Sequence, residues 1–446
     1  MEEIKDSSEF HVFYHEKCSD GSFCLNVLGI FLQLEDKKLI STKSGSLLEE
    51  LFKDFDSLYQ FHALGGDSSN KSEDPSSPHE KKGGYQKTQV LETCDQISSS
   101  DLLTNELKNL TVKNDSTFQR LSKLKVDIKD LCEASKISIH AVGDMNRTGG
   151  YLRPSSIPRS GKRSAVIFDC CPSLEILSKV SSSYDRVLIL DHHLSTRELF
   201  DSKQGIPKNV KLVFSNDVAA SKLSWSFFES KFGKLSEFLS PDLLKSITKT
   251  RDCVNAQDLG DLLFPNNVHF YLGCSKLNLG SMEDNRYECS FLKYSFNTIV
   301  TIGKGAYQNF EQNLDSFTKD AEVVTFSIPT EKGKIEYKIV HKRISKGMSD
   351  ISYIGRALSV ACHMQGDSPI VMMSKEMKGN LRVSLRSIGS EHSCLEIAKH
   401  FGGGGHFNAA GFLILPKNLA KDFRKVGNWK RKSTKPLLDL PLNKST

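Results

Sequence analysis

Carboxylates and imidazoles follow four apolar segments in the first 260 residues of this chain. They are His15 with Asp20, then Asp169, then Asp191 with His192 and His193, and finally Asp252. In an open sheet of parallel strands, ligands bind beyond the carboxyl ends of the strands, so we expect these side chains to converge. Aspartate and histidine gathered at one edge are common ligands of divalent metal ions. The sequence therefore predicts a metal site at this edge.

Each of these signals also has an ordinary structural explanation. A single aspartate after a strand commonly caps the helix that follows, and a single histidine on a strand is more often structural than a ligand. The triplet Asp191-His192-His193 is harder to explain in this way, because it directly follows the apolar run Val187–Leu190. Two imidazoles and a carboxylate buried there without partners would be costly.

An alternation of strand-like and helix-like segments positions these residues. A short strand, a tight turn at Ser19-Asp20-Gly21 and an apolar helix occupy 10–33, and further segments of both kinds lie at 164–180, 185–196, 218–232 and 243–256. We expect the last of these, a helix or strand, to end at Arg251-Asp252. This order predicts an α/β domain with a parallel sheet over residues 1–290.

A second, smaller α/β domain with a mixed sheet is expected over 321–415, after a connecting helix at 291–320. Its strands are predicted at "EVVTFSI", "IEYKIVHKR", "PIVMMSKE" and "LRVSLRSI", and its helices at "SYIGRALSVACHM" and "SCLEIAKHF". A chain of 446 residues is long enough for two or three domains. We interpret 41–163 as an insertion into the first domain, disordered at 65–84, where serine, glycine and charge leave little to bury.

The net charge of +6 is concentrated at the C-terminus, since residues 416–446 hold nine lysines and arginines against two aspartates. This basic tail is suited to a nucleic-acid backbone or to nuclear import, and equally to a solvated tail. No apolar run is long enough to span a bilayer, which excludes a membrane partner. The N-terminus resembles no signal or transit peptide, and the eleven cysteines include no CxxC pair. We expect reduced thiols and a cytoplasmic location, with a nuclear one as the alternative.

The stretch "HFGGGGHFNAAGF" at 400–412 stands between core-like segments, so a linker fits poorly there. Its glycines lack β-carbons, and their backbone N–H groups can therefore approach a phosphate or sugar closely. His406 adds a donor, and Arg386 in "SLRS" can grip a phosphate with two parallel hydrogen bonds. The predicted substrate-binding residues are Arg386, Gly403, Gly404, Gly405 and His406.

The ordered motifs "HEKCSDG", "IFDCCPS", "LDHH", "TRD", "SLRS" and "GGGGHFNAAGF" resemble the DHH phosphoesterase superfamily. More narrowly, they resemble the branch with a DHH-associated C-terminal domain of the GGGH type. The resemblance covers about 10–40 and 160–415. It implies two α/β domains with a cleft between them. It also implies a hydrolase, exonuclease-like, acting on phosphodiester or phosphomonoester bonds in single-stranded or short nucleic acids or nucleotides, and often a homodimer.

The resemblance implies two divalent metal ions, typically manganese, with magnesium, zinc or iron as alternatives. Carried over by motif, the first ion is held by His15 and Asp169, and the second by Asp20, Asp169, His192 and Asp252. Asp191 would orient the two histidines, and His193 would face the scissile phosphate. Two such ions polarise a phosphoryl oxygen and activate water.

One residue departs from the superfamily pattern. The first motif usually reads Asp-x-Asp, and here the triplet is Cys18-Ser19-Asp20. A thiolate ligand at Cys18 would soften the first site in favour of zinc or iron, or Cys18 is only a packing thiol. If neither metal binds, the alternative function is a nucleic-acid-binding protein without catalysis.

Overall fold

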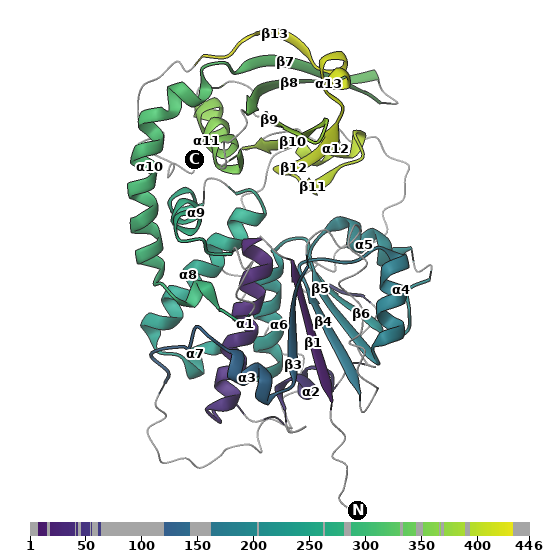
Figure 1. Cartoon of the computed structure of the whole chain (residues 1–446), viewed down its shortest axis with the longest axis vertical. Coiled ribbons are helices and arrows are strands. Elements are labelled where there is room, and N and C mark those ends of the chain that lie inside the picture. Colours follow the sequence, from purple (N-terminus) through teal and green to yellow (C-terminus); the bar gives the residue numbers. More distant parts are fainter. Residues whose placement is uncertain are drawn as a thin grey trace, which may run out of the picture. The chain divides into compact units, whose positions relative to one another are not determined.

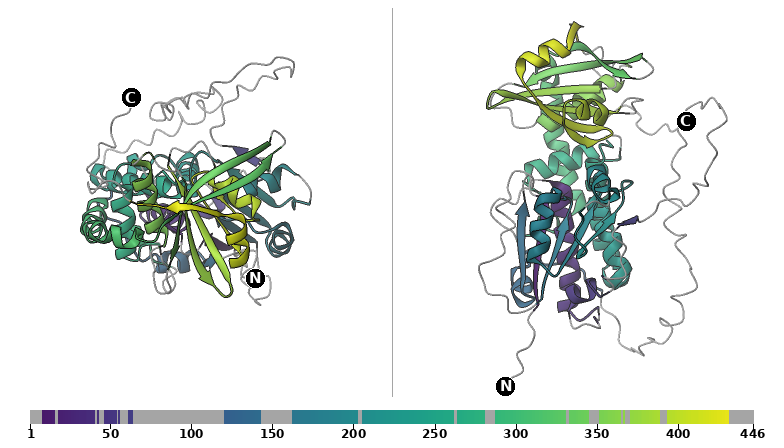
Figure 2. Two further views of the ribbon diagram at one scale, coloured as in Figure 1. Left: turned by 90° about the horizontal axis from the view of Figure 1, so that it is seen from above. Right: turned by 90° about the vertical axis from the view of Figure 1, so that its right-hand side faces the viewer.

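The structure is a computed structural model, shown in Figure 1 and from two further sides in Figure 2. It describes residues 8–15, 18–40, 42, 46–53, 55, 61–63, 120–142, 162–202, 205–261, 264–280, 287–330, 333–344, 351–364, 366, 370–388 and 393–430. The chain divides into two compact units, one formed by Met1–Leu64 with Leu121–Thr446 and the other by Gly65–Arg120. The second unit lies outside the described residues except for Arg120, so the following concerns the first.

The first sheet is entirely parallel and has six strands in the order β2-β6-β5-β4-β1-β3. The strands are β1 (Glu9–His15), β2 (Phe61–Ala63), β3 (Ile137–Val142), β4 (Arg163–Phe168), β5 (Arg186–Asp191) and β6 (Val210–Phe214). Because all six run in one direction, the residues that follow β1, β4 and β5 come out at one edge.

Helices cover both faces of this sheet, with α1 and α6 on one side and α4 and α5 on the other (Figure 1). The helices of this half are α1 (Ser19–Asp36), α2 (Leu47–Leu51), α3 (Lys129–Ala134), α4 (Leu174–Ser183), α5 (Leu194–Asp201), α6 (Ala220–Phe232), α7 (Leu235–Phe238), α8 (Pro241–Asp258), α9 (Asn267–Lys276) and the 3-10 turn η4 (Ser290–Leu292). Val166 and Phe168 of β4 belong to the core under α1 and α6, whereas Ala165 and Ile167 belong to the core under α4. Burial on both faces explains why these strands are continuously apolar.

The second sheet is mixed and has seven strands in the order β11-β12-β10-β9-β8-β7-β13. Only β8 and β9 pair in parallel within it. Its strands are β7 (Glu322–Thr330), β8 (Gly333–Ile344), β9 (Ile370–Met377), β10 (Asn380–Ser387), β11 (Gly404–His406), β12 (Ala409–Ile414) and β13 (Arg424–Asn428). The chain reaches it through α10 (Phe296–Thr318), and its other helices are α11 (Ile351–Met364), α12 (Cys394–His400) and α13 (Pro416–Asp422). The expected fold class, a parallel α/β sheet and a separate mixed sheet, is confirmed.

The structure corrects three boundaries expected from the sequence. The segment 41–163 is not all insertion, because β2 and β3 in it are edge strands of the first sheet. The tail at 416–446 begins with folded structure, because β13 pairs with β7 and Trp429 donates its N–H to the Ala321 carbonyl. The segment 243–256 is a helix that continues past Arg251-Asp252 to Asp258. The segments 65–84 and 431–446 lie outside the described residues.

None of the ten cysteines that the structure describes forms a disulfide. Among the described residues, no helix is both long and apolar enough to cross a membrane.

Candidate metal centre

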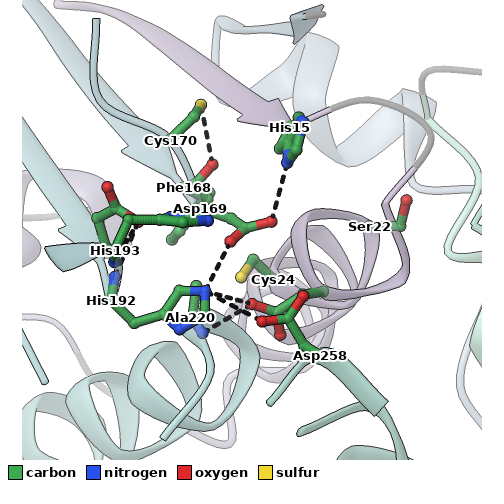
Figure 3. A network of polar contacts seen from close by, with 12 residues as sticks. His15, Ser22, Cys24, Phe168, Asp169, Cys170, His192, His193, Ala220 and Asp258 are labelled. Carbon is green, nitrogen blue, oxygen red and sulfur yellow. Dashed lines mark hydrogen bonds and ion pairs between the residues drawn. The ribbon is translucent and has the colours of Figure 1, made fainter. Parts of the chain in front are cut away.

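Asp169 lies at the centre of the cluster, directly after β4. Its backbone has a φ of +60°, a left-handed conformation that is uncommon for residues other than glycine. Its N–H donates to the Leu190 carbonyl of β5 at 3.0 Å, which holds the turn in place. The side chain, 1% exposed, lies with Oδ2 3.4 Å from His15 Nδ1 and Oδ1 3.3 Å from His192 Nε2. Figure 3 shows these contacts as dashed lines. One buried carboxylate thus contacts two imidazoles through different oxygens.

His192, in the turn after β5, faces three carboxylates with one ring nitrogen. Its Nε2 lies 3.2 Å from Asp258 Oδ2 and 3.7 Å from Asp20 Oδ2, besides the contact with Asp169. Ligand atoms of Asp20, His192 and Asp258 lie within 4.8 Å of one another. This set could hold one metal ion.

Asp20 is held by the N-terminus of α6. The N-cap of that helix is Ala219, which has no side-chain cap of its own. The Asp20 carboxylate accepts instead from the backbone N–H groups of Ala220 at 2.7 Å and Ser221 at 2.9 Å. An aspartate from another helix therefore caps α6, because the small residues at its start let the carboxylate approach.

Gly21 explains how Asp20 and His15 come together. A β-carbon at Gly21 would lie 2.5 Å from the carbonyl oxygen of His15, so α1 can start this close to the end of β1 only with glycine there. Cys18 lies just before α1, and its side chain does not cap that helix. Ligand atoms of His15, Cys18 and Asp169 lie within 4.8 Å of one another and form a second possible ligand set.

The acidic residue of the cluster from α8 is Asp258, and the expectation of Asp252 is corrected. The Asp252 carboxylate accepts two bonds from the Arg251 guanidinium, at 3.0 and 2.7 Å, and lies outside the cluster. Six residues later, Asp258 is about 9 Å further along the helix axis, at the end nearest His192. Gly260, with a φ of +76°, follows the helix end and is the sequence signal that could have located Asp258.

Asp191 connects the residues of the triplet. Its Oδ1 accepts from the His192 N–H at 2.8 Å and lies 2.7 Å from His193 Nδ1, and its Oδ2 accepts from the Thr196 hydroxyl. Because Nδ1 of His193 is engaged, Nε2 is the ring nitrogen left for other contacts. His193 and His192 are neighbouring rings, with centroids 4.5 Å apart.

The charges in this cluster are strongly coupled. Burial and the neighbouring carboxylates of Asp169 and Asp258 hold the pKa of Asp20 well above its usual range. Burial alone would raise the pKa of Asp169 too, but the imidazoles of His15 and His192 hold that pKa well below its usual range. Burial lowers the pKa of His192, yet Asp169 and Asp258 outweigh it and raise the pKa to about 9. Burial, followed by the charges of Asp169 and Asp258, raises the pKa of the Cys18 thiol.

The residues present fit divalent metal ions. Several buried polar atoms of the cluster have no hydrogen-bond partner among the described residues: His15 Nδ1, both Asp169 side-chain oxygens, His192 Nε2 and Asp258 Oδ2. Buried polar atoms are rarely left in this way unless a ligand or ion completes them. Nitrogen, oxygen and sulfur donors at these separations are what a metal ion requires.

The second sheet contributes His406 to this cluster. His406 Nε2 lies 3.4 Å from Asp258 Oδ2, and its ring centroid is 4.8 Å from that of His192 and 5.2 Å from that of His193. Burial lowers the pKa of His406 to about 4, despite the nearby Asp258 carboxylate. The histidine that the sequence predicted to bind substrate therefore lies beside the candidate metal ligands.

Two of the four glycines before His406 have a steric explanation. A β-carbon at Gly403 would lie 2.2 Å from the Gly411 carbonyl oxygen, and one at Gly405 would lie 2.5 Å from that of Ala409. Both therefore permit close pairing with β12. A β-carbon at Gly404 would meet nothing within 4 Å, so its glycine has no packing explanation. The prediction that these backbones bind substrate stays a prediction.

Two buried guanidinium groups lie near Asp258. Arg386 on β10 donates to the Leu385 carbonyl at 2.7 Å, and burial lowers its pKa. Arg356 on α11, 7% exposed, donates to the Gln257 carbonyl at 2.9 Å and lies 4.9 Å from the Tyr271 ring. Burial and the nearby Arg386 lower the pKa of Arg356 to about 10. Arg356 was missed in the sequence, where it stands in an ordinary amphipathic helix.

No family model and no curated protein sequence matches this chain. Solved structures do match. The DHH domain of a member of the s1p family of ribosomal proteins matches over 93% of this chain and 84% of its own, with 10% identity and a TM-score of 0.41. RecJ in complex with Mn²⁺ from Thermus thermophilus matches over 66% of this chain and 47% of its own, with 13% identity and a TM-score of 0.34. The pGpG-specific phosphodiesterase PggH from Vibrio cholerae matches over 65% of this chain and 90% of its own, with 12% identity and a TM-score of 0.30. The resemblance to the DHH superfamily and to its GGGH branch therefore rests on the motifs of the sequence.

Proposed function

We propose that this chain is a metal-dependent phosphoesterase that hydrolyses phosphodiester or phosphomonoester bonds in short nucleic acids or nucleotides. The observation that carries the proposal is the buried cluster around Asp169. Carboxylates, imidazoles and a thiol converge there from three strand ends and two helices, with polar atoms that have no partner among the described residues.

The described residues form four groups of possible ligand atoms, and two of these groups could hold a pair of ions on either side of Asp169. His15, Cys18 and Asp169 would hold one ion, and Asp20, His192 and Asp258, with the other Asp169 oxygen, would hold the second. When bound, a pair of divalent cations supplies polarisation of the phosphoryl oxygen and activation of a water molecule. The chain's own contribution is to fix the ligands: α6 anchors Asp20, and the turn at Asp169 directs its two oxygens to opposite imidazoles.

His193 and Asp191 are suited to proton transfer. Asp191 engages His193 Nδ1 at 2.7 Å, which fixes the ring and directs Nε2 elsewhere. The charge of Asp191 outweighs burial and raises the pKa of His193 to about 10, which favours the protonated imidazole. In the proposed reaction this proton goes to the leaving oxygen of the ester.

Features of the second sheet favour a nucleic-acid or nucleotide substrate. His406 lies beside the metal ligands, and Arg356 and Arg386 supply buried positive charge for a phosphate. The ring of Phe407, adjacent to His406, is 43% exposed. An exposed aromatic ring at a phosphate site can stack a base, at about 1–3 kcal/mol.

The test measures whether purified full-length protein hydrolyses a labelled dinucleotide, short single-stranded RNA and DNA, or nucleoside monophosphates. Each substrate is incubated with Mn²⁺, Mg²⁺, Zn²⁺ or Fe²⁺. We expect turnover with at least one metal, and a loss of at least about 1,000-fold in Asp169→Asn, which keeps the side-chain shape. Folded wild-type protein that turns over none of these substrates with any metal would contradict the proposal. Salt-dependent binding without hydrolysis would then indicate the non-catalytic nucleic-acid-binding protein.

A further inference from the structure

We propose that the first ion position is a His-Cys-Asp set that selects a thiophilic divalent cation, Zn²⁺ or Fe²⁺, over Mn²⁺ and Mg²⁺. The thiolate of Cys18 is the group that makes the selection. The inference rests on the proposed function only in placing a metal ion at this cluster. It goes beyond that function by naming the class of metal.

The side chain of Cys18 does not cap the helix that it precedes. Cys18 occupies the N-cap position of α1 in extended conformation, with φ −117°, and its side chain makes no capping bond. Its backbone carbonyl accepts from the Ser22 N–H at 3.1 Å, and the Gly21 N–H acts on its sulfur in the direction that favours a thiolate. Its sulfur lies within 4.8 Å of a ligand atom of His15 and of Asp169. The side chain thus occupies a ligand position.

The other two members of the set point independently to an ion. Asp169 is 1% exposed, and neither of its oxygens has a hydrogen-bond partner among the described residues. His15 Nδ1, 3.4 Å from Asp169 Oδ2, is likewise without one. Cys18 therefore adds a sulfur beside a histidine–aspartate ion pair whose facing atoms make no hydrogen bond among the described residues.

The neighbouring cysteines differ from Cys18 in this respect. Cys24 is fully buried and accepts from the Ser224 hydroxyl at 3.5 Å. Cys170 donates to the Phe168 carbonyl at 3.3 Å (Figure 3), and Cys171 to the Pro172 carbonyl at 3.5 Å. Among the described cysteines, Cys18 alone belongs to a group of ligand atoms.

The chemistry of the set explains the expected selectivity. Thiolates are soft ligands that favour zinc and iron, whereas magnesium and manganese favour carboxylate, carbonyl and water oxygens. One sulfur, one imidazole nitrogen and one carboxylate oxygen leave a coordination position open, as in catalytic zinc sites with three protein ligands. Replacing Cys18 by aspartate would make the set harder and move it toward manganese.

Cobalt spectroscopy tests the thiolate directly. The full-length protein is freed of metal and titrated with Co²⁺, for which a bound thiolate gives an intense near-ultraviolet charge-transfer band. We expect this band in the wild type and in Cys24→Ser, and its loss in Cys18→Ser and Cys18→Asp. In competition, the ratio of Zn²⁺ to Mn²⁺ affinity should fall by at least about 10-fold in Cys18→Asp. Wild-type protein that binds Co²⁺ without the band, or an unchanged affinity ratio, would overturn the inference.

X-ray absorption of zinc-loaded wild-type protein provides a test that needs no variant. We expect a zinc–sulfur scattering path at about 2.3 Å, and its absence would reject the inference even if the variants do not fold. These readouts separate the two proposals. Hydrolysis without a thiolate signal supports the phosphoesterase alone, and a thiolate signal without hydrolysis supports the metal set alone.

Discussion

The carboxylate of Asp258 lies 3.2 Å from the imidazole of His192, Oδ2 to Nε2, at the point where the last turn of α8 meets the end of β5. The same oxygen lies 3.4 Å from His406 on β11. Asp258 thus contacts both His192, which follows β5 of the first sheet, and His406, which belongs to β11 of the second sheet. Any ligand that binds between these imidazoles will depend on its position.

Asp258→Asn should remove a metal ligand without changing the size of the side chain. We expect metal affinity at the second ion position, and the turnover rate with it, to fall on the order of 100-fold or more. Replacing even a hydrogen-bond partner of a metal ligand typically lowers metal affinity or activity 10–100-fold. Asp252→Asn is the matched control on the same helix. It should leave metal affinity and turnover within about two-fold of their wild-type values. Calorimetric titration with metal and a turnover assay measure the two effects. Equal losses in both variants would show that α8 acts through its fold rather than through Asp258.

The contrast between these two aspartates shows where sequence reasoning reached its limit. The sequence predicts that the segment ends at "TRD", whereas α8 begins at Pro241, with Ser240 as its N-cap, and ends at Asp258 before the glycine turn at 260. Both aspartates lie on α8. The aspartate that faces His192 is the one at the C-terminal end of the helix, so its identification depends on knowing where the helix ends. The pattern of strand ends located Asp20, Asp169 and His192 because the side chains directly follow strands or their turns. A residue at the end of a helix has no such constraint.

His406→Ala should weaken substrate binding while leaving the metal ions bound. His406 contacts Asp258 at 3.4 Å and belongs to neither of the two sets proposed to hold the ions, although it forms a further group of possible ligands with His192 and His193. We expect KM for a dinucleotide to rise by about 10-fold or more, corresponding to about 1.4 kcal/mol, with metal content by elemental analysis unchanged. His400→Ala is the control, because that imidazole is exposed and packs against Phe326. Loss of metal from His406→Ala would instead assign His406 as a ligand.

Gly403→Ala and Gly404→Ala should separate packing from binding in the glycine run. A methyl group at Gly403 would collide with the Gly411 carbonyl, so we expect a loss of about 2 kcal/mol or more in the free energy of unfolding. At Gly404 there is open space, and the loss should stay within about 0.5 kcal/mol. Urea unfolding measures both. If Gly404→Ala then raises KM at unchanged stability, its backbone approaches the substrate, and an unchanged KM removes Gly404 from the predicted binding residues.

The secondary structure of the chain was more predictable than its domain boundaries. Strands β4 and β5 are predictable from their apolar runs, because burial on both faces leaves no polar alternation. β2 has three residues and β13 is largely exposed, so neither carries enough buried sequence to signal a strand. Their places in the sheets are set by pairing with β6 and β7, which a local pattern cannot reveal. Arg356 was missed for a similar reason, because its contact with Gln257 joins elements distant in the sequence.

Acidification should destabilise the second sheet through His341, away from the metal cluster. His341 on β8 lies with Nε2 2.8 Å from the Ser374 hydroxyl of β9. Burial lowers its pKa to about 4, although Glu322 of β7 partly opposes this and Arg343 and Lys342 add to it. Its pKa in the unfolded chain is about 6.5. Between these values the unfolded state binds more protons than the folded state, so stability is fully present above pH 6.5 and is lost as the pH falls toward 4.

The size of this effect can be measured by urea unfolding of the metal-free protein from pH 7 to pH 4.5. The contribution of His341 should fall by about 2 kcal/mol over this range. His341→Gln, which keeps a polar group near Ser374 but does not titrate, should remove that part of the pH dependence. The relevant quantity is the difference in slope between the two proteins, because other groups titrate equally in both. If the stabilities of the wild type and His341→Gln changed in parallel with pH, the pKa of His341 would be the same in the folded and unfolded states, which contradicts the prediction.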